Sequence, residues 1–337
     1  MMLGETSPKP PSAVAVVIPC YRERAHILDV IAKIGPQVSK IYVVDDACPD
    51  QTGAFVASQC RDPRVAVLTH PINLGVGGAT ITGYRQALGD GMAVIVKIDG
   101  DGQMDPALLA HFVEPLLAGD ADYTKGNRFY HLESLHAMPW GRLIGNALLT
   151  FLTKISSGYW NLFDPTNGYT AIHANVVREL ALDKLRPDFF FESDMLFRLN
   201  ILRAHVVDIP MRALYQNERS SLRIGRVVLP FIYFHLRNGA KRLFYNYFLR
   251  DFSIATLELL TGLGLLAFGT AFGAYQWHYH ASIGNFASAG TVLLAVLPLL
   301  VGVQLLLSFL GYDIGNVPKR PIHPFLAPRA TRPGLPP

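Results

Sequence analysis

The sequence predicts an α/β fold, with a mainly parallel sheet that carries helices on both faces. Short apolar runs alternate with segments of helical periodicity in the first part of the chain, and this alternation is typical of βαβ units. The apolar runs are continuous, as in strands covered on both faces. Three of them end in polar clusters, which in such sheets gather at the carboxyl ends of the strands.

The expected elements follow one another at short intervals. Strands are expected over residues 13–18, 40–44, 65–68 and 93–98, and helices over 23–34, 52–60, 76–88, 139–157 and 189–200. The Gly-rich stretch 73–84 either cradles a phosphate or lets a helix pack closely against the sheet. The second interpretation is favoured, because the stretch lacks the Lys-Ser/Thr pair of a phosphate-binding loop.

The sequence after the fourth strand is rich in acids. Asp99, Asp101 and Gln103 are spaced by two residues, and on an extended chain such side chains share a face. Two carboxylates and an amide oxygen suit Mg²⁺ or Mn²⁺ held together with a substrate's phosphates. The alternative is an ordinary polar turn, since Asp and Gly are common turn residues.

Two more polar clusters follow strands, at residues 19–23 and at Asp45-Asp46. Ligands of parallel sheets bind at this edge, so we expect one crevice there. Its carboxylates would repel one another unless a cation or ligand hydroxyls lay between them. The expected carboxylates are Glu23, Asp45, Asp99 and Asp101, with Tyr21 beside them.

At this point six motifs can be read in order. They are IPCYRE (18–23), VVDDACPDQT (43–52), NLGVGGATITGY (73–84), KIDGDGQMDP (97–106), KGNR (125–128) and DPTNGYTA (164–171). Together they resemble a family 2 glycosyltransferase of the GT-A fold, in the branch of dolichyl- and polyprenyl-phosphate sugar synthases such as dolichol-phosphate mannose synthase. Departures from the family pattern are Ala47-Cys48 after the acidic pair and Thr170 in the last motif.

The resemblance implies roles for particular residues. Donor binding is expected of Pro19, Tyr21, Glu23, Asp45, Asp46, Asp99 and Gly100. The metal ligands are expected to be Asp99, Asp101 and Gln103, and the catalytic residues Asp99, Asp101 and Arg128. The acceptor is expected to meet Arg128, Arg142, Asn146 and Arg223. Glu192 and Asp194 resemble an acidic pair at the acceptor side, or are acids favoured by the dipole at a helix start.

The last part of the chain predicts a membrane region. Hydrophobic residues make up 50% of the sequence and the mean hydropathy is +0.25, both high for a soluble protein. Residues 219–251 mix aromatics with cations, which suits a membrane surface; a soluble helix pair with snorkelling cations is the alternative. Stretches 252–275 and 289–312 contain one charge, Glu258, and each would reach about 36 Å, enough for a bilayer core.

The cations also predict the topology. Lys and Arg flank both stretches but are absent from residues 276–288, so that loop is expected outside, with the catalytic domain and both termini cytoplasmic. Glu258 is expected to snorkel or to pair with Arg250. The domains are expected to be a disordered lead (1–12), a GT-A catalytic domain (13–218), the basic segment, the two spans with their loop, and a disordered tail (313–337).

The expected function is the inverting transfer of one hexose from a UDP- or GDP-linked sugar to a polyprenyl phosphate, with Mg²⁺ or Mn²⁺. A net charge of +4 is too small to indicate nucleic acid, and three cysteines without metal spacing fit a reduced compartment. The sequence leaves open whether the chain forms a homo-oligomer. The alternatives are an enzyme with a hydroxyl acceptor, a processive polysaccharide synthase and a non-catalytic scaffold. A processive synthase usually carries a Gln-x-x-Arg-Trp motif, whereas residues 216–220 read QNERS.

Overall fold

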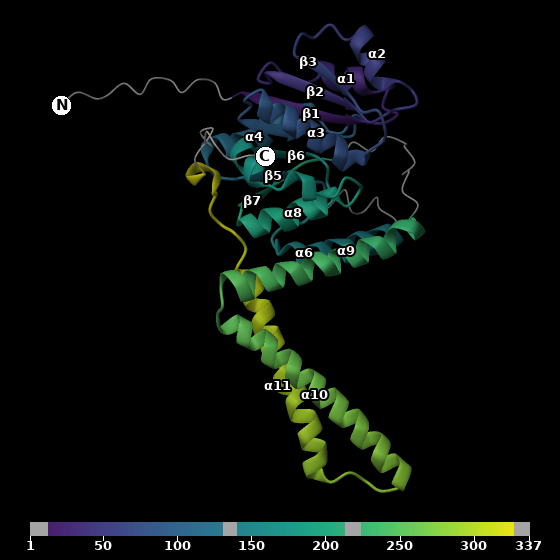
Figure 1. Cartoon of the computed structure of the whole chain (residues 1–337), viewed down its shortest axis with the longest axis vertical. Helices are drawn as coiled ribbons and strands as arrows, with labels where there is room; N and C mark the ends of the chain where they lie inside the picture. The colour runs from purple at the N-terminus through teal and green to yellow at the C-terminus, as the bar shows by residue number, and fades with distance from the viewer. Residues whose placement is uncertain (1–12, 131–139, 213–223, 327–337) are drawn as a thin grey trace, which may run out of the picture. The chain divides into compact units, whose positions relative to one another are not determined.

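The computed structural model describes residues 13–130, 140–212 and 224–326. It divides into two compact units. The sheet unit is made of Met1–Gly239 and Pro318–Pro337, and the hairpin unit of Ala240–Val317. Most helices and strands of both units are labelled in Figure 1.

The sheet unit is built on seven strands in the order β3-β2-β1-β4-β6-β5-β7. The strands are β1 (Val14–Cys20), β2 (Lys40–Asp45), β3 (Val65–Thr69), β4 (Val94–Lys97), β5 (Tyr123–Asn127), β6 (Thr170–His173) and β7 (Val206–Pro210). β6 runs antiparallel to β4 and β5, and the other pairs are parallel. The α/β class and the first four strands are therefore confirmed.

The helices described in this part of the chain lie between these strands in sequence, except α9, which follows β7. They are α1 (Ile27–Ala32), α2 (Thr52–Gln59), α3 (Gly75–Gly89), α4 (Leu109–Ala118), α6 (Trp140–Ser157), α7 (Ala174–Glu179), α8 (Phe191–Leu202) and α9 (Ile224–Phe244). Two short 3-10 helices are η1 (Pro106–Leu108) and η2 (Leu182–Lys184). The first helix is shorter than expected, because residues 23–26 form turns.

Helices cover both faces of the sheet. On one face Val14, Val16 and Ile18 of β1 form a buried core with residues of α1, α2 and α4. Val17, which points the other way, meets α3: a Cβ on Gly83 would lie 2.2 Å from Val17 Cγ1. The close-packing interpretation of the Gly-rich stretch is therefore confirmed at Gly83, where only a bare backbone fits.

The end of the chain differs from the expected disordered tail. α11 (Ala289–Gly315) extends past residue 313, and η4 (His323–Phe325) follows it. His323 is buried and its ring stacks on His173 with centroids 4.0 Å apart. Residues 318–326 thus dock on the sheet unit through polar contacts that composition does not reveal, while 327–337 lie outside the described residues.

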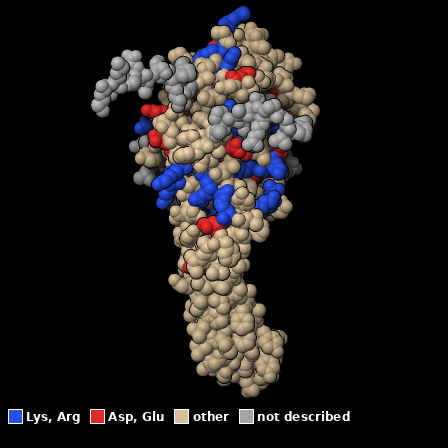
Figure 2. Space-filling model, turned by 60° about the vertical axis from the view of Figure 1, so that its left-hand side comes forward, with Lys and Arg blue, Asp and Glu red and all other residues tan. Residues whose placement is uncertain are grey.

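The hairpin unit contains two long apolar helices, α10 (Ile254–Ile283) and α11. Both are long and apolar enough to cross a membrane. On the face shown in Figure 2, most of this hairpin carries neither Lys nor Arg. α10 runs eight residues beyond the expected end at 275, because no helix breaker occurs before Gly284, whose φ is +69°. The loop therefore shrinks to residues 284–288.

Polar contacts join the hairpin internally. Ser308 Oγ donates a hydrogen bond to Glu258 Oε1 at 2.8 Å. Glu258 therefore has a partner on α11, an interaction that was not expected beside snorkelling or pairing with Arg250. Further along α11, Asp313 accepts hydrogen bonds from both Arg242 Nη atoms at 2.6 and 3.0 Å, and from Tyr247 Oη at 2.6 Å. All three of these side chains are buried, so the network fixes the start of the unit to the end of α11.

Candidate active site

The sheet unit contains a pocket of about 930 Å³ at the carboxyl ends of β1 and β4. Its walls also include the start of α3 and side chains of α6, α8 and α9. Nine residues predicted from the sequence line it: Pro19, Tyr21, Glu23, Asp46, Asp99, Gly100, Asp101, Arg128 and Asn146. The predicted crevice is therefore present, and all six motifs contribute to its lining. Two of them, NLGVGGATITGY and DPTNGYTA, contribute only residues that were not predicted, among them Gly75 and Gly168.

Two predicted residues lie away from the pocket lining, and two others fall outside what the structure describes. Asp45 and Gln103 do not line the pocket. Arg142 belongs to α6, but its side chain lies outside what the structure describes, and Arg223 lies in the undescribed range 213–223.

The loop after β4 holds its two acids in a tight turn. Asp101 Oδ1 accepts the backbone N–H of Gln103 at 2.9 Å, and Gly102 has a φ of +77°. The turn interpretation is correct, and the same turn presents Asp99 and Asp101 to the pocket. Within the described ranges no three His, Cys, Asp or Glu side chains form a ready metal cluster. Mg²⁺ takes few protein ligands and fills its shell with phosphate and water, so the oxygen donors present fit such an ion.

A buried lysine lies against this loop. Lys97 Nζ donates to Asp99 Oδ1 at 2.8 Å and to Glu192 Oε1 at 3.2 Å. Burial alone would lower the pKa of Lys97, but the carboxylates of Asp99 and Glu192 outweigh it and hold that pKa above its ordinary value. Lys97 is therefore a permanent cation at the pocket.

The last motif joins the pocket to the sheet. Asp164, which is fully buried, accepts hydrogen bonds from Arg128 Nε at 2.7 Å and from Arg128 Nη2 at 3.0 Å. This two-point pairing fixes the plane of the guanidinium. The backbone carbonyl of Asn167 accepts a hydrogen bond from the ammonium of Lys125 on β5. Burial lowers the pKa of Lys125 to about 8.

The two acids after β2 have structural bonds. Asp45 accepts the backbone N–H groups of Cys48 at 2.7 Å and Gly53 at 2.5 Å. Asp46 accepts those of Leu74 and Gly75 at 2.8 and 2.7 Å, where α3 begins. An anion is favoured at a helix N-terminus, so Asp46 anchors the Gly-rich stretch at the edge of the pocket.

The acidic pair of α8 separates into two roles. Glu192 lines the pocket. Asp194 does not: its Oδ1 accepts from Asn238 of α9 at 2.9 Å, and its Oδ2 from Arg198 at 2.9 Å. A second tie to α9 is the 2.8 Å bond between His235 Nδ1 and Ser156 Oγ of α6. Asp194 therefore holds helices together.

Several pocket residues were missed by the sequence interpretation. Lys97 ends an otherwise apolar strand, and that exception was the available signal. The apolar side chains of Leu149, Phe189 and Phe231 also line the pocket. The sequence interpretation assigned only polar residues of the helix over 139–157 to the acceptor, and it assigned residues 219–251 to a membrane surface, so it placed none of these three apolar side chains at the site.

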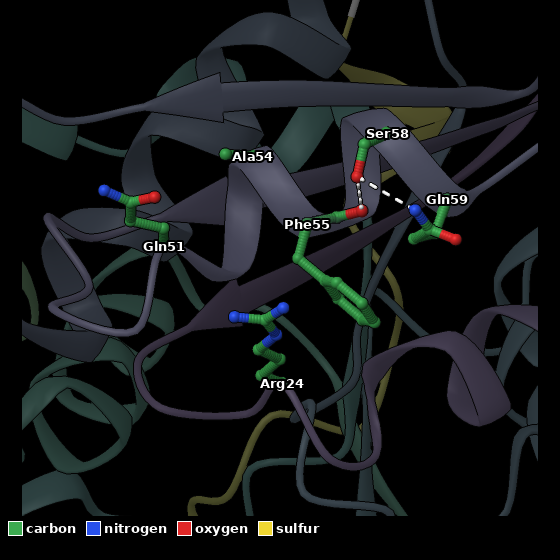
Figure 3. Close-up of a pocket in the computed structure, with 6 residues that line it drawn as sticks. All are labelled: Arg24, Gln51, Ala54, Phe55, Ser58 and Gln59. Atoms are coloured by element: carbon green, nitrogen blue, oxygen red, sulfur yellow. Dashed lines mark hydrogen bonds between the residues drawn. The ribbon is translucent and has the colours of Figure 1, made fainter.

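A smaller hollow of about 270 Å³ lies on α2 (Figure 3). Figure 3 shows Arg24 beneath the ring of Phe55, with the guanidinium carbon 4.5 Å from the ring centroid. Ser58 Oγ donates to the carbonyl of Phe55 at 2.9 Å. The hollow has no carboxylate lining, so the larger pocket is the candidate active site.

The sheet order and the acidic pocket define a nucleotide-sugar transferase of the GT-A class, and comparison with known proteins agrees. Residues 15–181 match the model of glycosyl transferase family 2. An undecaprenyl-phosphate mannosyltransferase from Micrococcus luteus is 31% identical over 224 residues, covering 64% of this chain and 91% of the relative. A polyprenol monophosphomannose synthase from Mycolicibacterium smegmatis is 30% identical, covering 60% and 78%. The chain therefore belongs to glycosyl transferase family 2, as its motifs predicted.

A solved structure supports the fold. Glucosyl-3-phosphoglycerate synthase from Mycobacterium tuberculosis, in complex with Mn²⁺, UDP-glucose and phosphoglyceric acid, superimposes with a TM-score of 0.54. It is 19% identical, and the match covers 68% of this chain and 80% of that one. At this identity the likeness establishes the GT-A fold.

Proposed function

We propose that the chain transfers one hexose from a UDP- or GDP-linked sugar to a polyprenyl or dolichyl phosphate at the cytoplasmic face of a membrane. One observation carries the proposal. The acidic loop after β4 and the apolar side chains Leu149, Phe189 and Phe231 line the same pocket. A nucleotide diphosphate and the first part of a lipid could therefore meet there. Relatives named for transfer to polyprenyl phosphates support the choice of acceptor.

The donor side is assigned to the edge of β1 and β4. Tyr21 and Glu23 would bind the base and ribose, beside Pro19, Asp46 and Gly100. Asp45 would act indirectly, since its two oxygens hold the loop from Cys48 to Gly53. Asp99, Asp101 and Gln103 would hold Mg²⁺ or Mn²⁺, which when bound takes up the negative charge that develops on the leaving diphosphate.

The acceptor side is assigned to Arg128 and Asn146, with Arg142 and Arg223 added from the sequence. A phosphate monoester has a second pKa of about 6, so at neutral pH the acceptor is already a nucleophile. A general base is then unnecessary. The protein must orient the phosphate, and Arg128 is held in a fixed plane by Asp164. Direct displacement on the sugar inverts its anomeric carbon.

The hairpin unit is proposed as the anchor. Its two helices would cross the membrane, and the distribution of cations supports an orientation with both termini and the sheet unit in the cytoplasm. α9 exposes Leu229, Tyr233 and Leu236 at 75%, 61% and 65%. Such a face suits the headgroup layer, which would bring the lipid acceptor to the pocket at high local concentration.

A hydroxyl acceptor is the second candidate, because Glu192 lines the pocket and a carboxylate there could remove a proton. The two candidates are separated by a transfer assay with the full chain in nanodiscs. UDP- and GDP-linked radiolabelled sugars are offered with either a polyprenyl phosphate or the corresponding polyprenol. We expect label in the phosphate-containing lipid alone. Label in the polyprenol, or in an added saccharide, would overturn the proposal.

A further inference from the structure

Lys97 uses its whole hydrogen-bonding capacity at the pocket. Its ammonium has three donors and three acceptors: Asp99 Oδ1 at 2.8 Å, Glu192 Oε1 at 3.2 Å and the carbonyl of Gly168 at 3.3 Å. The side chain is 1% exposed. The lysine thereby joins three separate segments: the acidic loop, the last motif and the first turn of α8.

Packing alone does not explain a lysine here. Moving an ammonium out of water costs several kcal/mol, and the preceding residues of β4 are all apolar and buried. An apolar side chain would continue that pattern. The cost is offset by Asp99 and Glu192, both of which line the pocket. The lysine at this position is therefore matched to these two carboxylates of the pocket.

Gly168 keeps the space for this pair. A Cβ at Gly168 would lie 2.5 Å from Asp99 Oδ2 and 2.7 Å from Lys97 Nζ. Both distances are shorter than real contacts, so any side chain would displace the carboxylate or the ammonium. A bare backbone at residue 168 and the lysine at residue 97 together determine where Asp99 lies.

We propose that Lys97 is a positioning residue, which orients Asp99 for the divalent metal of the donor complex and ties the acidic loop to Glu192 of α8. The inference rests on the metal site of the proposed function. Without the lysine, Asp99 and Glu192 would lose their shared counter-charge and turn apart. Removing Lys97 has two opposite effects on metal binding. The loss of orientation at Asp99 weakens binding, whereas the loss of a nearby positive charge by itself favours it. Whether the variant binds the metal more weakly or more tightly therefore shows which effect dominates.

Lys125 provides the matched control. It is a second buried lysine, and its backbone is in register with Thr170, which is also the register partner of Lys97. Its ammonium bonds to the carbonyl of Asn167, and it does not line the pocket. Lys97→Met and Lys125→Met thus remove the same group from the two strands that flank β6 in one sheet.

The experiment measures Mn²⁺ binding by the purified full chain, using the electron paramagnetic resonance signal of free Mn²⁺ and needing no turnover. Lys97→Met should raise the Kd for Mn²⁺ about 10–100-fold, as for other groups that orient a metal ligand. Lys125→Met should leave it unchanged. Thermal unfolding of each variant shows whether both remain folded. Gly168→Ala should also weaken Mn²⁺ binding, whereas Gly89→Ala, where a Cβ meets nothing within 4 Å, should not.

The Mn²⁺-binding results distinguish a positioning role of Lys97 from a general loss of structure. Unchanged or tighter Mn²⁺ binding by Lys97→Met would overturn the positioning role while leaving the metal site intact. Equal weakening by Lys97→Met and Lys125→Met would reduce the effect to general loss of structure and overturn it too. If Lys97→Met does not fold, the comparison of Gly168→Ala with Gly89→Ala decides. Absence of Mn²⁺ binding by the unaltered chain would instead remove the metal from the proposed function.

Discussion

His323 Nδ1 donates to Asp122 Oδ1 at 2.8 Å, although the two residues are 201 positions apart. The same carboxylate accepts the backbone N–H groups of Ile322, His323 and His205. Asp122 directly precedes β5 and His205 directly precedes β7. β5 runs parallel with β7, and antiparallel β6 separates β5 from β4. The end of the chain is therefore fastened to the edge of the sheet opposite the pocket.

We predict that Asp122→Asn lowers the stability of the sheet unit. The loss of charge-assisted hydrogen bonds at a buried site is worth about 1.5–3 kcal/mol, and a chain ending at Val317 should lose a similar amount. Thermal unfolding in detergent measures both. Asp120→Asn, at an exposed position, is the control. Equal melting temperatures for all four proteins would show that the docked turn contributes nothing.

The same contact has a pH dependence. Burial alone would raise the pKa of Asp122, but the hydrogen bonds from His323 and the backbone outweigh it, so the pKa is lowered. An acid with a lowered pKa stabilises the fold above its ordinary pKa of about 4, and this contribution is lost as the pH falls further. The destabilisation caused by Asp122→Asn should therefore shrink in acid.

Asp208 is predicted to behave in the opposite way. Burial raises its pKa to about 6, and its Oδ1 has no hydrogen-bond partner within the described residues. The ionised form is thus disfavoured in the folded chain. Asp208→Asn should stabilise the protein at neutral pH by on the order of 1–2 kcal/mol, allowing for partial exposure.

The pH profile tests that sign. The raised pKa makes the penalty grow between about pH 4 and pH 6, so the advantage of Asp208→Asn should disappear toward pH 4. Asparagine can still accept from Asn127 and from the backbone of Phe163, as the carboxylate does. A variant less stable than the parent at pH 7.5 would contradict the prediction.

Asp101→Asn is predicted to abolish nearly all transfer while leaving the fold intact. The asparagine oxygen can keep the 2.9 Å bond from the backbone N–H of Gln103, so the turn should persist and only the charge is lost. EDTA should have the same effect on the unaltered chain. Steady-state transfer and thermal unfolding are measured together. Full activity in metal-free buffer would rule out the metal at Asp99 and Asp101.

Local pattern predicted the first four strands because each is a short apolar run ended by polar residues. It did not predict β5 and β6, whose segments were interpreted only as the motifs around Lys125 and Thr170. Lys125 interrupts the apolar pattern of β5, and its buried ammonium bonds to the carbonyl of Asn167, which a distant segment contributes. The docked turn around His323 was missed for the same reason: its partner, Asp122, is remote in sequence.

The candidate site shows the same division. The loop after β4 could be placed at the ligand edge of the sheet, and Asp99 and Asp101 are found there. A turn, where an extended chain was expected, presents these two acids and leaves Gln103 out of the lining. The separate roles of Glu192 and Asp194 could not be predicted, because they depend on Lys97 of β4 and Asn238 of α9. Side-chain partners from distant segments decide such roles.

The topology prediction can be tested at the loop between the two long helices. Asn285→Cys, in a background where Cys60 is replaced by Ser, should react with a membrane-impermeant maleimide from outside intact cells. Cys20 and Cys48 are buried and should stay silent. Asp120→Cys, in the sheet unit, should react only after permeabilisation. The reverse pattern would invert the proposed orientation.

The last prediction concerns the nucleophile. If the acceptor is a phosphate dianion, the transfer rate should rise with pH through the acceptor's own pKa, about 6, and then level off. Glu192→Gln should retain substantial turnover, because it removes a charge but keeps an oxygen that can accept from Lys97. Asp194→Asn should instead lower stability, since Asp194 bonds to Arg198 and Asn238. Steady-state transfer to a short-chain polyprenyl phosphate, with the binding of both substrates measured separately, distinguishes the cases. Loss of chemistry in Glu192→Gln with unaltered substrate binding would require a general base, and a hydroxyl acceptor would then be the better assignment.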